Sequence, residues 1–430
     1  MGEVSSSPPK TLREKWKLIG PGVILAAAAI GSGELILTPR AGALYGLSVG
    51  WIILVSVVYK LFLTLGLARY TIGTGEDIFV GFSHLPGPRN WFVWVMVAIY
   101  LIGAVGYSGI SLACGSALYA LLPSLSMVQW AVIVVILAFA LLLSGSYKPV
   151  EKAAFILSFV LIAGVLYSLA ALRPDPAWFF KGLTPHWTAG SGQTAVSLLG
   201  WTAGGTSTLI YSFWILEKGI GRNGSDGQNF KGWLSLIRLD TGISYFLMIL
   251  VSLAFLTIGV LVLSTAGPGG MPLIPAREET TLVLSRLLTV ATGPQTKFIF
   301  LVAALAILYS TVIGLVDGKS RALRSATHII FPKSRKISSI KMYRLYATLM
   351  CLIIFAFLFT QRPVVLIVLI SALEAPVLSL SAIVLVYLTH KKLPRSMRPG
   401  ILWYSVIVIG TILYLVLSSY VLVKTVLGQF

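Results

Sequence analysis

The stretch that decides the fold is LIGPGVILAAAAIGSGELILTPRAGALY, residues 18–45. This apolar segment is long enough to cross a bilayer, but Gly31-Ser32-Gly33 interrupts it and Glu34 follows at once. Glycines weaken a helix and free its backbone groups, and a carboxylate at this depth is costly in a membrane. An interrupted span with an ionisable residue is typical of the substrate site of a transporter.

The whole chain has the composition of a multi-pass membrane protein. Of its 430 residues, 57% are hydrophobic and 11% are charged, whereas soluble domains carry roughly 25% charged residues. The net charge of +19 lies mainly in short segments between apolar runs, which indicates a topology signal rather than a surface for nucleic acid. Cys114 and Cys351 lie inside apolar runs, which favours free buried thiols over a disulfide or a metal site.

Eleven apolar segments predict an all-α membrane protein with eleven transmembrane helices. The segments are residues 18–45, 49–67, 92–118, 128–145, 152–171, 193–216, 240–264, 295–316, 343–360, 363–389 and 400–424. Most basic residues fall on one side if the N-terminus is cytoplasmic, so we expect the C-terminus outside. The most basic inner segment is the loop 317–342, which contains Lys319 and is expected to meet anionic lipid heads. We expect a prokaryotic plasma (inner) membrane as its location.

The sixth segment repeats the irregularity of the first. Gly200, Gly204 and Gly205 precede Thr206, and Ser207 follows. Interruptions in the first and sixth spans imply inverted repeats of five spans with a site between them, although such glycines also serve close helix packing. The predicted organisation is a cytoplasmic segment 1–17, a first repeat 18–171, a second repeat 193–389, and an eleventh span with the C-terminus 400–430.

Three charged residues lie deep in the predicted spans. Glu34 either binds substrate or caps the second half of its helix, and the membrane penalty favours substrate binding. Glu374 could hold a cation together with carbonyls freed by Pro376, or could bond to a broken helix. Lys60 is expected to extend to the membrane interface.

These observations define the candidate site. The candidate substrate-binding residues are Gly31, Ser32, Gly33, Glu34, Gly204, Gly205, Thr206, Ser207, Tyr211 and Glu374, of which Glu34 and Glu374 are candidate metal ligands. No catalytic residue and no cofactor are expected, because no nucleophile–base pair, phosphate loop or metal-ligand cluster is visible. The chain is therefore not expected to be an enzyme.

Several motifs, taken in their order along the chain, resemble the Nramp family of divalent-metal transporters. They are Gly20-Pro21-Gly22, Arg40-Ala41-Gly42-Ala43, Ala68-Arg69-Tyr70, Thr74-Gly75-Glu76-Asp77, Tyr147-Lys148-Pro149-Val150-Glu151-Lys152 and Pro174-Asp175-Pro176-Ala177-Trp178 followed by Gly182-Leu183-Thr184-Pro185. The resemblance implies the LeuT-type fold of five plus five inverted repeats, broken helices 1 and 6, and alternating access.

The residues at the site depart from the family pattern. Metal-transporting members carry Asp-Pro-Gly-Asn where this chain has Gly31-Ser32-Gly33-Glu34, and Met-Pro-His where it has Gly204-Gly205-Thr206. The thioether that favours soft metals is therefore missing. The acidic positions of the family's third span fall on Ile102, Gly109 and Leu112, so proton coupling of the family's kind is not expected.

Three functions remain open. The leading hypothesis is uptake of a hard divalent cation such as Mg²⁺, driven by the membrane potential without protons. The second is transport of an amino acid or another small organic solute, whose carboxylate Ser32 and the backbone at Gly33 would bind while Glu34 takes the ammonium. The third is a receptor-like protein without transport. The expected partners are the transported cation or solute and membrane lipids, with no nucleic acid.

Overall fold

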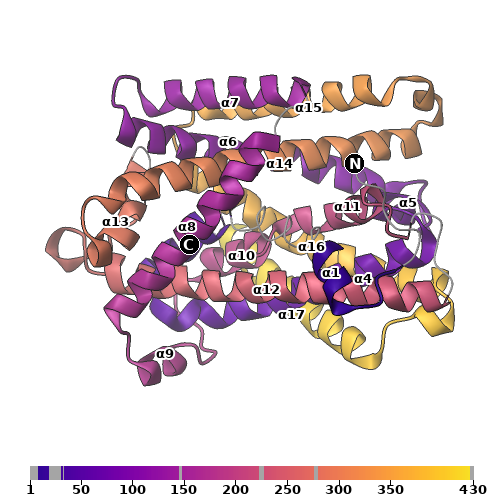
Figure 1. Cartoon of the computed structure of the whole chain (residues 1–430), viewed down its shortest axis with the longest axis horizontal. Helices are drawn as coiled ribbons and strands as arrows, with labels where there is room; N and C mark the ends of the chain where they lie inside the picture. The colour runs from indigo at the N-terminus through magenta and orange to yellow at the C-terminus, as the bar shows by residue number, and fades with distance from the viewer. Residues whose placement is uncertain are drawn as a thin grey trace.

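A computed structural model describes residues 8–18, 31, 33–144, 148–221, 227–275 and 279–426 of the chain. All regular elements among these residues are helical, so the predicted all-α class is confirmed for them (Figure 1). Ser32, a candidate site residue, lies outside the described residues, as does the first half of the segment 18–45 from residue 19 to residue 30.

The helices have the following bounds. They are α1 (Leu12–Leu18), η1 (Gly33–Leu37), α3 (Thr38–Tyr45), η2 (Gly46–Val49), α4 (Gly50–Thr74), α5 (Ile78–Ser83), α6 (Trp91–Leu121), α7 (Met127–Ser144), α8 (Lys148–Leu172), α9 (Pro176–Gly182), α10 (Gly192–Trp201), η3 (Gly205–Ile210), α11 (Tyr211–Glu217), α12 (Gly227–Leu263), η4 (Pro268–Gly270), α13 (Thr280–Thr292), α14 (Thr296–Ile330), η6 (Pro332–Lys336), α15 (Ser339–Leu358), α16 (Pro363–Lys392), η7 (Arg395–Met397) and α17 (Ile401–Val426).

Eight helical segments in the described part are long and apolar enough to cross a membrane. The pair α8 and α9, bent by 115° relative to each other, would be a ninth. The predicted number of eleven spans stays a prediction, because residues 19–30 lie outside the described part and α10, at 10 residues, is too short to count by itself. The multi-pass character of the chain does not depend on that number.

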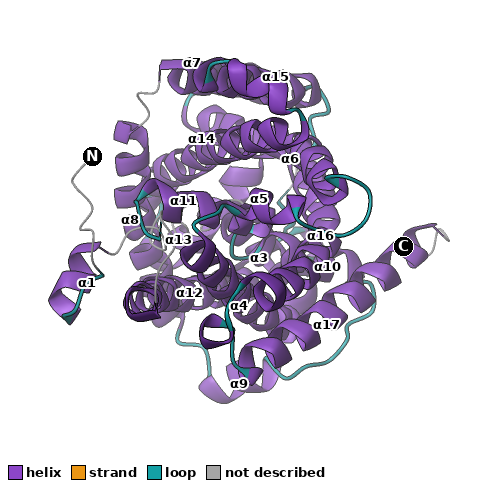
Figure 2. Ribbon diagram, turned by 90° about the vertical axis from the view of Figure 1, so that its right-hand side faces the viewer, coloured by secondary structure: helices purple, strands orange, loops and turns teal. Residues whose placement is uncertain are grey.

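The long helices are arranged in layers. Helices α7 and α15 lie side by side at one edge of the molecule, and α6 and α14 form the next layer beneath them (Figures 1 and 2). The remaining layers contain α10 packed against α16, and α12 packed against α3 and α4. The two short helices η1 and η3 lie inside this arrangement, and every residue of both is buried.

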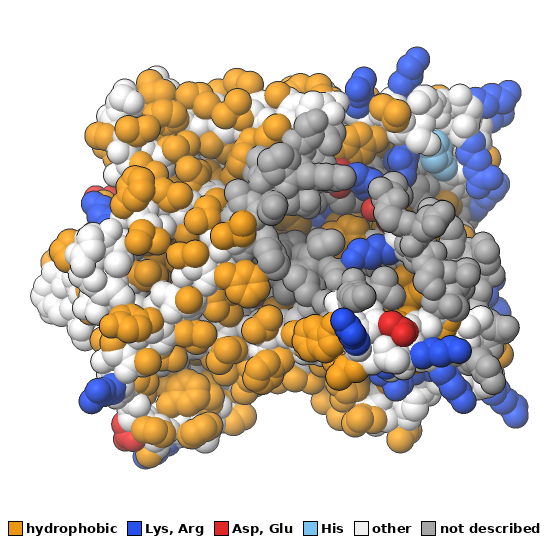
Figure 3. Space-filling view, viewed as in Figure 1, with side chains coloured by type: hydrophobic (Ala, Val, Ile, Leu, Met, Phe, Trp, Pro, Cys, Tyr) orange, Lys and Arg blue, Asp and Glu red, His pale blue; other side chains and the backbone are white. Residues whose placement is uncertain are grey.

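The outer surface is that of a protein in contact with lipid. In Figure 3, apolar side chains cover most of the visible face, while Lys and Arg side chains gather at its right-hand end. Large exposed apolar residues such as Phe246, Phe298 and Ile409 lie on separate long helices. Apolar surface of this extent marks a membrane-facing protein.

The structure corrects the predicted basic loop 317–342. Helix α14 continues to Ile330, so the first half of that loop is helical. Lys319 is fully buried within α14 and does not reach a lipid head group. Apolar residues recur past the predicted span end at Ala322, Leu323 and Ala326, which are buried, and this keeps one face of the helix inside the protein.

Candidate functional site

The candidate site is built around an interruption between α10 and η3. Helix α10 ends at Trp201, and Ala203, Gly204 and Gly205 follow in left-handed conformations, with φ of 59°, 99° and 54°. Glycine adopts such angles without strain, whereas Ala203 does so at an energetic cost. The break turns the N–H groups of Ala203 and Thr206 toward side chains of other helices.

Glu34 lies on one side of this break and is fully buried in η1. Its Oε1 accepts a hydrogen bond from the backbone N–H of Ala203 at 2.9 Å and a longer one from the Ser252 hydroxyl at 3.4 Å. Its Oε2 is buried without a hydrogen-bond partner among the described residues. An unpaired buried carboxylate oxygen costs free energy that a hydrogen-bond or cation partner would recover.

Gly33 allows η1 to pack closely against the end of α10. A Cβ at Gly33 would lie 3.0 Å from the carbonyl oxygen of Trp201, which is tighter than ordinary contacts. Gly31, also buried, supplies the carbonyl that accepts a hydrogen bond from the N–H of Leu35 at 2.9 Å. Both glycines thus support the backbone around Glu34.

Glu374 lies on the other side of the break, in α16, with both carboxylate oxygens engaged. Its Oε2 accepts a hydrogen bond from the N–H of Thr206 at 2.9 Å, and its Oε1 forms an ion pair with Lys319 Nζ at 2.9 Å. Both side chains of the pair are almost completely buried. Gly205 leaves room for this carboxylate, because a Cβ there would lie 2.4 Å from Glu374 Oε2.

The prediction that Lys60 extends to the membrane interface is wrong. Lys60 is fully buried, and its Nζ donates hydrogen bonds to the carbonyl oxygens of Gly200, at 3.1 Å, and of Thr202. Carbonyls at the C-terminal end of a helix lack intrahelical partners and carry a partial negative charge, so α10 attracts a cation at this point. That attraction directs the side chain inward.

The sequence predicted three charged residues deep in the spans, and the structure contains more of them. Two carboxylates and two ammonium groups surround the seven residues from Gly200 to Thr206. Lys319 was missed because the predicted eighth span ended at residue 316, although the helical pattern beyond it could have revealed this residue. Asp240 in α12 and Asp317 in α14 are also buried.

The remaining candidate residues lie on the same segment in different roles. Thr206 contacts Glu374 through its N–H and Lys319 through its Oγ1, the latter at 3.1 Å. The N–H of Ser207 donates to the carbonyl of Gly204 at 3.1 Å, which closes the first turn of η3. Tyr211 is fully buried at the start of α11.

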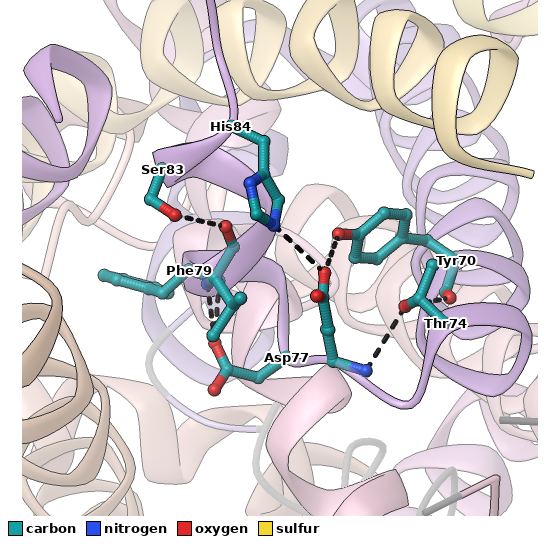
Figure 4. Close-up of polar contacts among 8 residues, drawn as sticks. Tyr70, Thr74, Asp77, Phe79, Ser83 and His84 are labelled. Carbon is teal, nitrogen blue, oxygen red and sulfur yellow. Dashed lines mark hydrogen bonds and ion pairs between the residues drawn. The ribbon is translucent and has the colours of Figure 1, made fainter. Parts of the chain in front are cut away.

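A second polar cluster follows α4, at the Thr74-Gly75-Glu76-Asp77 motif (Figure 4). The Tyr70 hydroxyl donates to Glu76 Oε2 at 2.7 Å, and His84 Nε2 lies 3.4 Å from the same oxygen. Asp77 caps α5 by accepting from the N–H groups of Phe79 and Val80. Burial raises the pKa of Asp77 above its usual value, while these two N–H donors act to lower it.

Asp77 also connects α5 to the layer above it. The Ser325 hydroxyl of α14 donates to Asp77 Oδ2 at 3.2 Å. The motif therefore caps and anchors a short helix, and it lies apart in sequence and in contacts from Glu34 and Glu374. Its role is structural.

The described residues contain no group of three or more His, Cys, Asp or Glu side chains arranged to hold a metal ion. What the break offers instead is one carboxylate oxygen at Glu34, the Ser252 hydroxyl beside it, and backbone groups freed from helical bonding. This donor set consists of oxygen atoms and suits a hydrated hard cation or a polar solute.

Comparison with known proteins places this chain in a family. The model of the natural resistance-associated macrophage protein-like family, Nramp, matches residues 22–424. The chain is 25% identical over 311 residues to the divalent metal cation transporter MntH of Erwinia tasmaniensis, covering 71% of each protein. It is 23% identical over 334 residues to an uncharacterized protein of Pasteurella multocida, covering 75% of this chain and 73% of that protein.

Solved structures share the fold at low sequence identity. A mutant of the Eremococcus coleocola manganese transporter superposes with a TM-score of 0.67 at 16% identity, covering 97% of this chain and 90% of that one. MhsT, solved in complex with L-phenylalanine, gives 0.57 at 17% identity, covering 95% and 98%. MHP1, a nucleobase-cation-symport-1 family transporter, gives 0.58 at 14%, covering 94% and 92%. With the family model spanning almost the whole sequence, this chain belongs to the Nramp family.

Proposed function

We propose that this chain transports a hard divalent cation, Mg²⁺, through the break between α10 and η3, and that it does so without proton coupling. The observation that carries the proposal is the buried, unpartnered Oε2 of Glu34. A buried acceptor without a partner costs about 1–3 kcal/mol, which a bound cation would relieve.

The cargo class rests on the relatives and on the donor atoms. A relative is named as a divalent metal cation transporter and a structural neighbour as a manganese transporter. The side-chain oxygens recorded at this point are those of Glu34 and Ser252, and Gly204-Gly205-Thr206 contains no thioether. Mg²⁺ binds through one or two carboxylates and retains several waters, so a single carboxylate suffices for it.

The absence of proton coupling is proposed from α6 and from the driving force. Ile102, Gly109 and Leu112 of α6 cannot bind or release a proton at the positions where related transporters carry acids. A divalent ion gains about 4.6 kcal/mol per 100 mV of inside-negative potential, at about 2.3 kcal/mol per charge. The potential by itself can therefore drive uptake.

For the architecture we propose eleven spans in two inverted repeats, residues 18–171 and 193–389, with interrupted first and sixth spans. The packing of α6 on α14 and of α7 on α15, next to each other in Figure 2, supports matching spans three and four with spans eight and nine. We also propose a cytoplasmic N-terminus, which the uneven distribution of Lys and Arg in Figure 3 supports.

The test is Mg²⁺ uptake into proteoliposomes under a potassium diffusion potential. We expect saturable, potential-dependent uptake that a pH gradient leaves unchanged. Glu34→Gln keeps the size of the side chain and removes its charge, so uptake should fall at least about tenfold, equivalent to about 1.4 kcal/mol. Glu279→Gln, a change at an exposed carboxylate before α13, is the matched control and should leave uptake unchanged. Uptake that survives Glu34→Gln would remove Glu34 from the site.

A second candidate is an amino acid or a similar zwitterion. The specific observation in its favour is that Lys60 and Lys319 balance the two carboxylates, so a cargo without net charge would leave the balance intact. MhsT, which shares the fold, is solved with L-phenylalanine. A thermal-shift screen of amino acids against divalent ions separates the two, because a ligand specific for the folded state raises the melting temperature. If the protein neither binds nor takes up amino acids or divalent ions, the receptor-like alternative is favoured.

A further inference from the structure

Lys319 is surrounded in the way that proteins surround a bound cation. Its Nζ lies 2.9 Å from Glu374 Oε1 and 3.1 Å from Thr206 Oγ1. The same ammonium lies over the rings of Tyr100 and Tyr107, 4.7 Å and 5.1 Å from their centroids. Aromatic faces attract cations, so a carboxylate, a hydroxyl and two rings form a complete cation site.

This site joins four separate elements. Lys319 comes from α14, Glu374 from α16, Thr206 from η3, and both tyrosines from α6. Gly103 of α6 makes room for the ammonium, because a Cβ there would lie 3.3 Å from Lys319 Nζ and 3.5 Å from Glu374 Oε1. One positive charge therefore connects the α6–α14 layer with the segment that contains the break.

We infer that the Lys319 ammonium is a built-in monovalent cation that permanently occupies a second cation site of this transporter. A positive charge is needed here because Glu374 is almost fully buried and a carboxylate without a counter-charge is costly in such surroundings. A soluble ion would supply that charge only while it is bound. A protonated lysine supplies it without an ion having to bind, because its side chain is covalently attached to the chain.

The inference rests on the proposed function and restricts its mechanism. Glu374 is closed to cargo, which leaves Glu34 as the only carboxylate of the break that can bind an incoming ion. It also means that no soluble cation has to accompany the cargo at Glu374, since Lys319 already provides the charge. The specificity of the transporter is thereby set by Lys319 as well as by the residues that contact cargo.

The experiment is to remove the tethered charge and ask whether a soluble ion replaces it. Lys319→Ala leaves Glu374 without its counter-charge and vacates the volume of the lysine side chain. We measure the unfolding temperature of the purified protein in detergent, in NaCl or choline chloride at equal concentration. Na⁺ carries the same single charge as the ammonium and prefers oxygen ligands, whereas choline is too large for the vacated space.

We expect NaCl to raise the unfolding temperature of Lys319→Ala above its value in choline chloride by about 2 °C or more, increasing with concentration. The wild-type protein should show no such difference, because Lys319 fills the site. Lys319→Ala/Glu374→Gln should also show none, since the carboxylate that attracts Na⁺ is gone. Lys319→Arg retains the charge and serves as a second insensitive control.

Three results would overturn the inference. They are a sodium response of equal size in the wild-type protein, a sodium response that persists in Lys319→Ala/Glu374→Gln, and a Lys319→Ala protein that folds in neither salt or gains nothing from Na⁺. The readout is the stability of purified protein and requires no uptake. A failure of the magnesium proposal, seen as uptake that is insensitive to Glu34→Gln, is thus distinguished from a failure here.

Discussion

Glu34 and Glu374 are the same residue type on opposite sides of one backbone break, yet their chemical states differ. Each accepts a backbone N–H from the break at 2.9 Å, Glu34 from Ala203 and Glu374 from Thr206. Glu374 then completes its bonding with Lys319, whereas Oε2 of Glu34 has no partner among the described residues. The two carboxylates are both buried and differ in their direct contacts: Glu374 forms an ion pair, whereas the hydrogen bonds of Glu34 in the described part go to Oε1.

The two lysines differ in the same way. Lys319 neutralises a carboxylate directly, while Lys60 binds the carbonyl oxygens of Gly200 and Thr202 at the end of α10. The ammonium of Lys60 supports the broken helix and leaves the second oxygen of Glu34 uncovered. Among the described residues, Glu34 thus keeps one carboxylate oxygen without a hydrogen-bond partner, whereas both oxygens of Glu374 are engaged.

The largest expected effect on stability comes from removing the ion pair between Glu374 and Lys319. Glu374→Leu leaves the Lys319 ammonium buried without a counter-charge, and we expect the free energy of unfolding to fall by about 3–5 kcal/mol. Glu34→Leu should cost less, about 1–3 kcal/mol, because it leaves one backbone N–H without its acceptor and removes an oxygen that was already unpaired. Chemical denaturation in detergent micelles measures both.

The control for this prediction is the double change Lys319→Met/Glu374→Leu. It replaces the buried ion pair by apolar side chains of similar size and should recover most of the stability lost in Glu374→Leu. Equal losses of stability for Glu34→Leu and Glu374→Leu would contradict the difference proposed between these two carboxylates.

A smaller effect on stability is expected from a substitution that moves α10 away from α16 and leaves both carboxylates unchanged. A Cβ at Gly200 would lie 1.7 Å from the carbonyl oxygen of Ser371, so Gly200→Ala must move α10 away from α16. We expect a loss of about 1–3 kcal/mol in stability, as for other overpacked sites. Gly242→Ala in α12 is the matched control.

At Gly242 an added Cβ meets nothing within 4 Å, and the residue lies inside a helix. Alanine there should raise stability by about 0.5–1 kcal/mol, because it restricts the unfolded chain. If thermal unfolding shows the Gly200→Ala and Gly242→Ala variants to be equally stable, the close packing of α10 on α16 does not contribute to stability.

The smallest effect concerns an ion pair two residues from Lys319 on the same helix. Arg321 contacts Glu217 at 2.7 Å and Asp317 at 2.9 Å, but its side chain is 31% exposed and that of Glu217 is 51% exposed. Solvent screens such pairs, so Arg321→Ala should cost only about 0.2–1 kcal/mol in low salt. The difference from wild type should shrink in high salt. A loss of stability as large as that of Glu374→Leu would show that burial does not make the Lys319–Glu374 pair stronger than the pairs of Arg321.

Sequence reasoning reached the membrane class, the family and the three residues Glu34, Thr206 and Glu374 that lie at the break. It succeeded because apolar runs and glycine pairs are local signals, and because a carboxylate within an apolar run stands out by itself. It placed Lys60 at the interface, since the usual behaviour of a lysine near a span end gives no information on what lies inside the bundle. Ser207 and Tyr211 lie on the segment that follows the break, in η3 and at the start of α11.

Lys319 shows most clearly where sequence reasoning ends. In the sequence it stands between two other charged residues, Asp317 and Arg321, and this local density predicted a loop. In the structure α14 turns Lys319 inward and leaves Arg321 partly exposed, because residues two apart on a helix point in different directions.

The sequence by itself determined that this protein is a helical membrane protein of the Nramp family. Only the tertiary structure decided that Glu374 pairs with Lys319 and that one oxygen of Glu34 has no hydrogen-bond partner among the described residues. Hydrophobicity, glycine content and charge are properties that each residue carries along the chain. The pairing of Glu374 with Lys319 joins residues from two helices, and the energy of that pair depends on a distance of 2.9 Å and on burial that only the packed helices create.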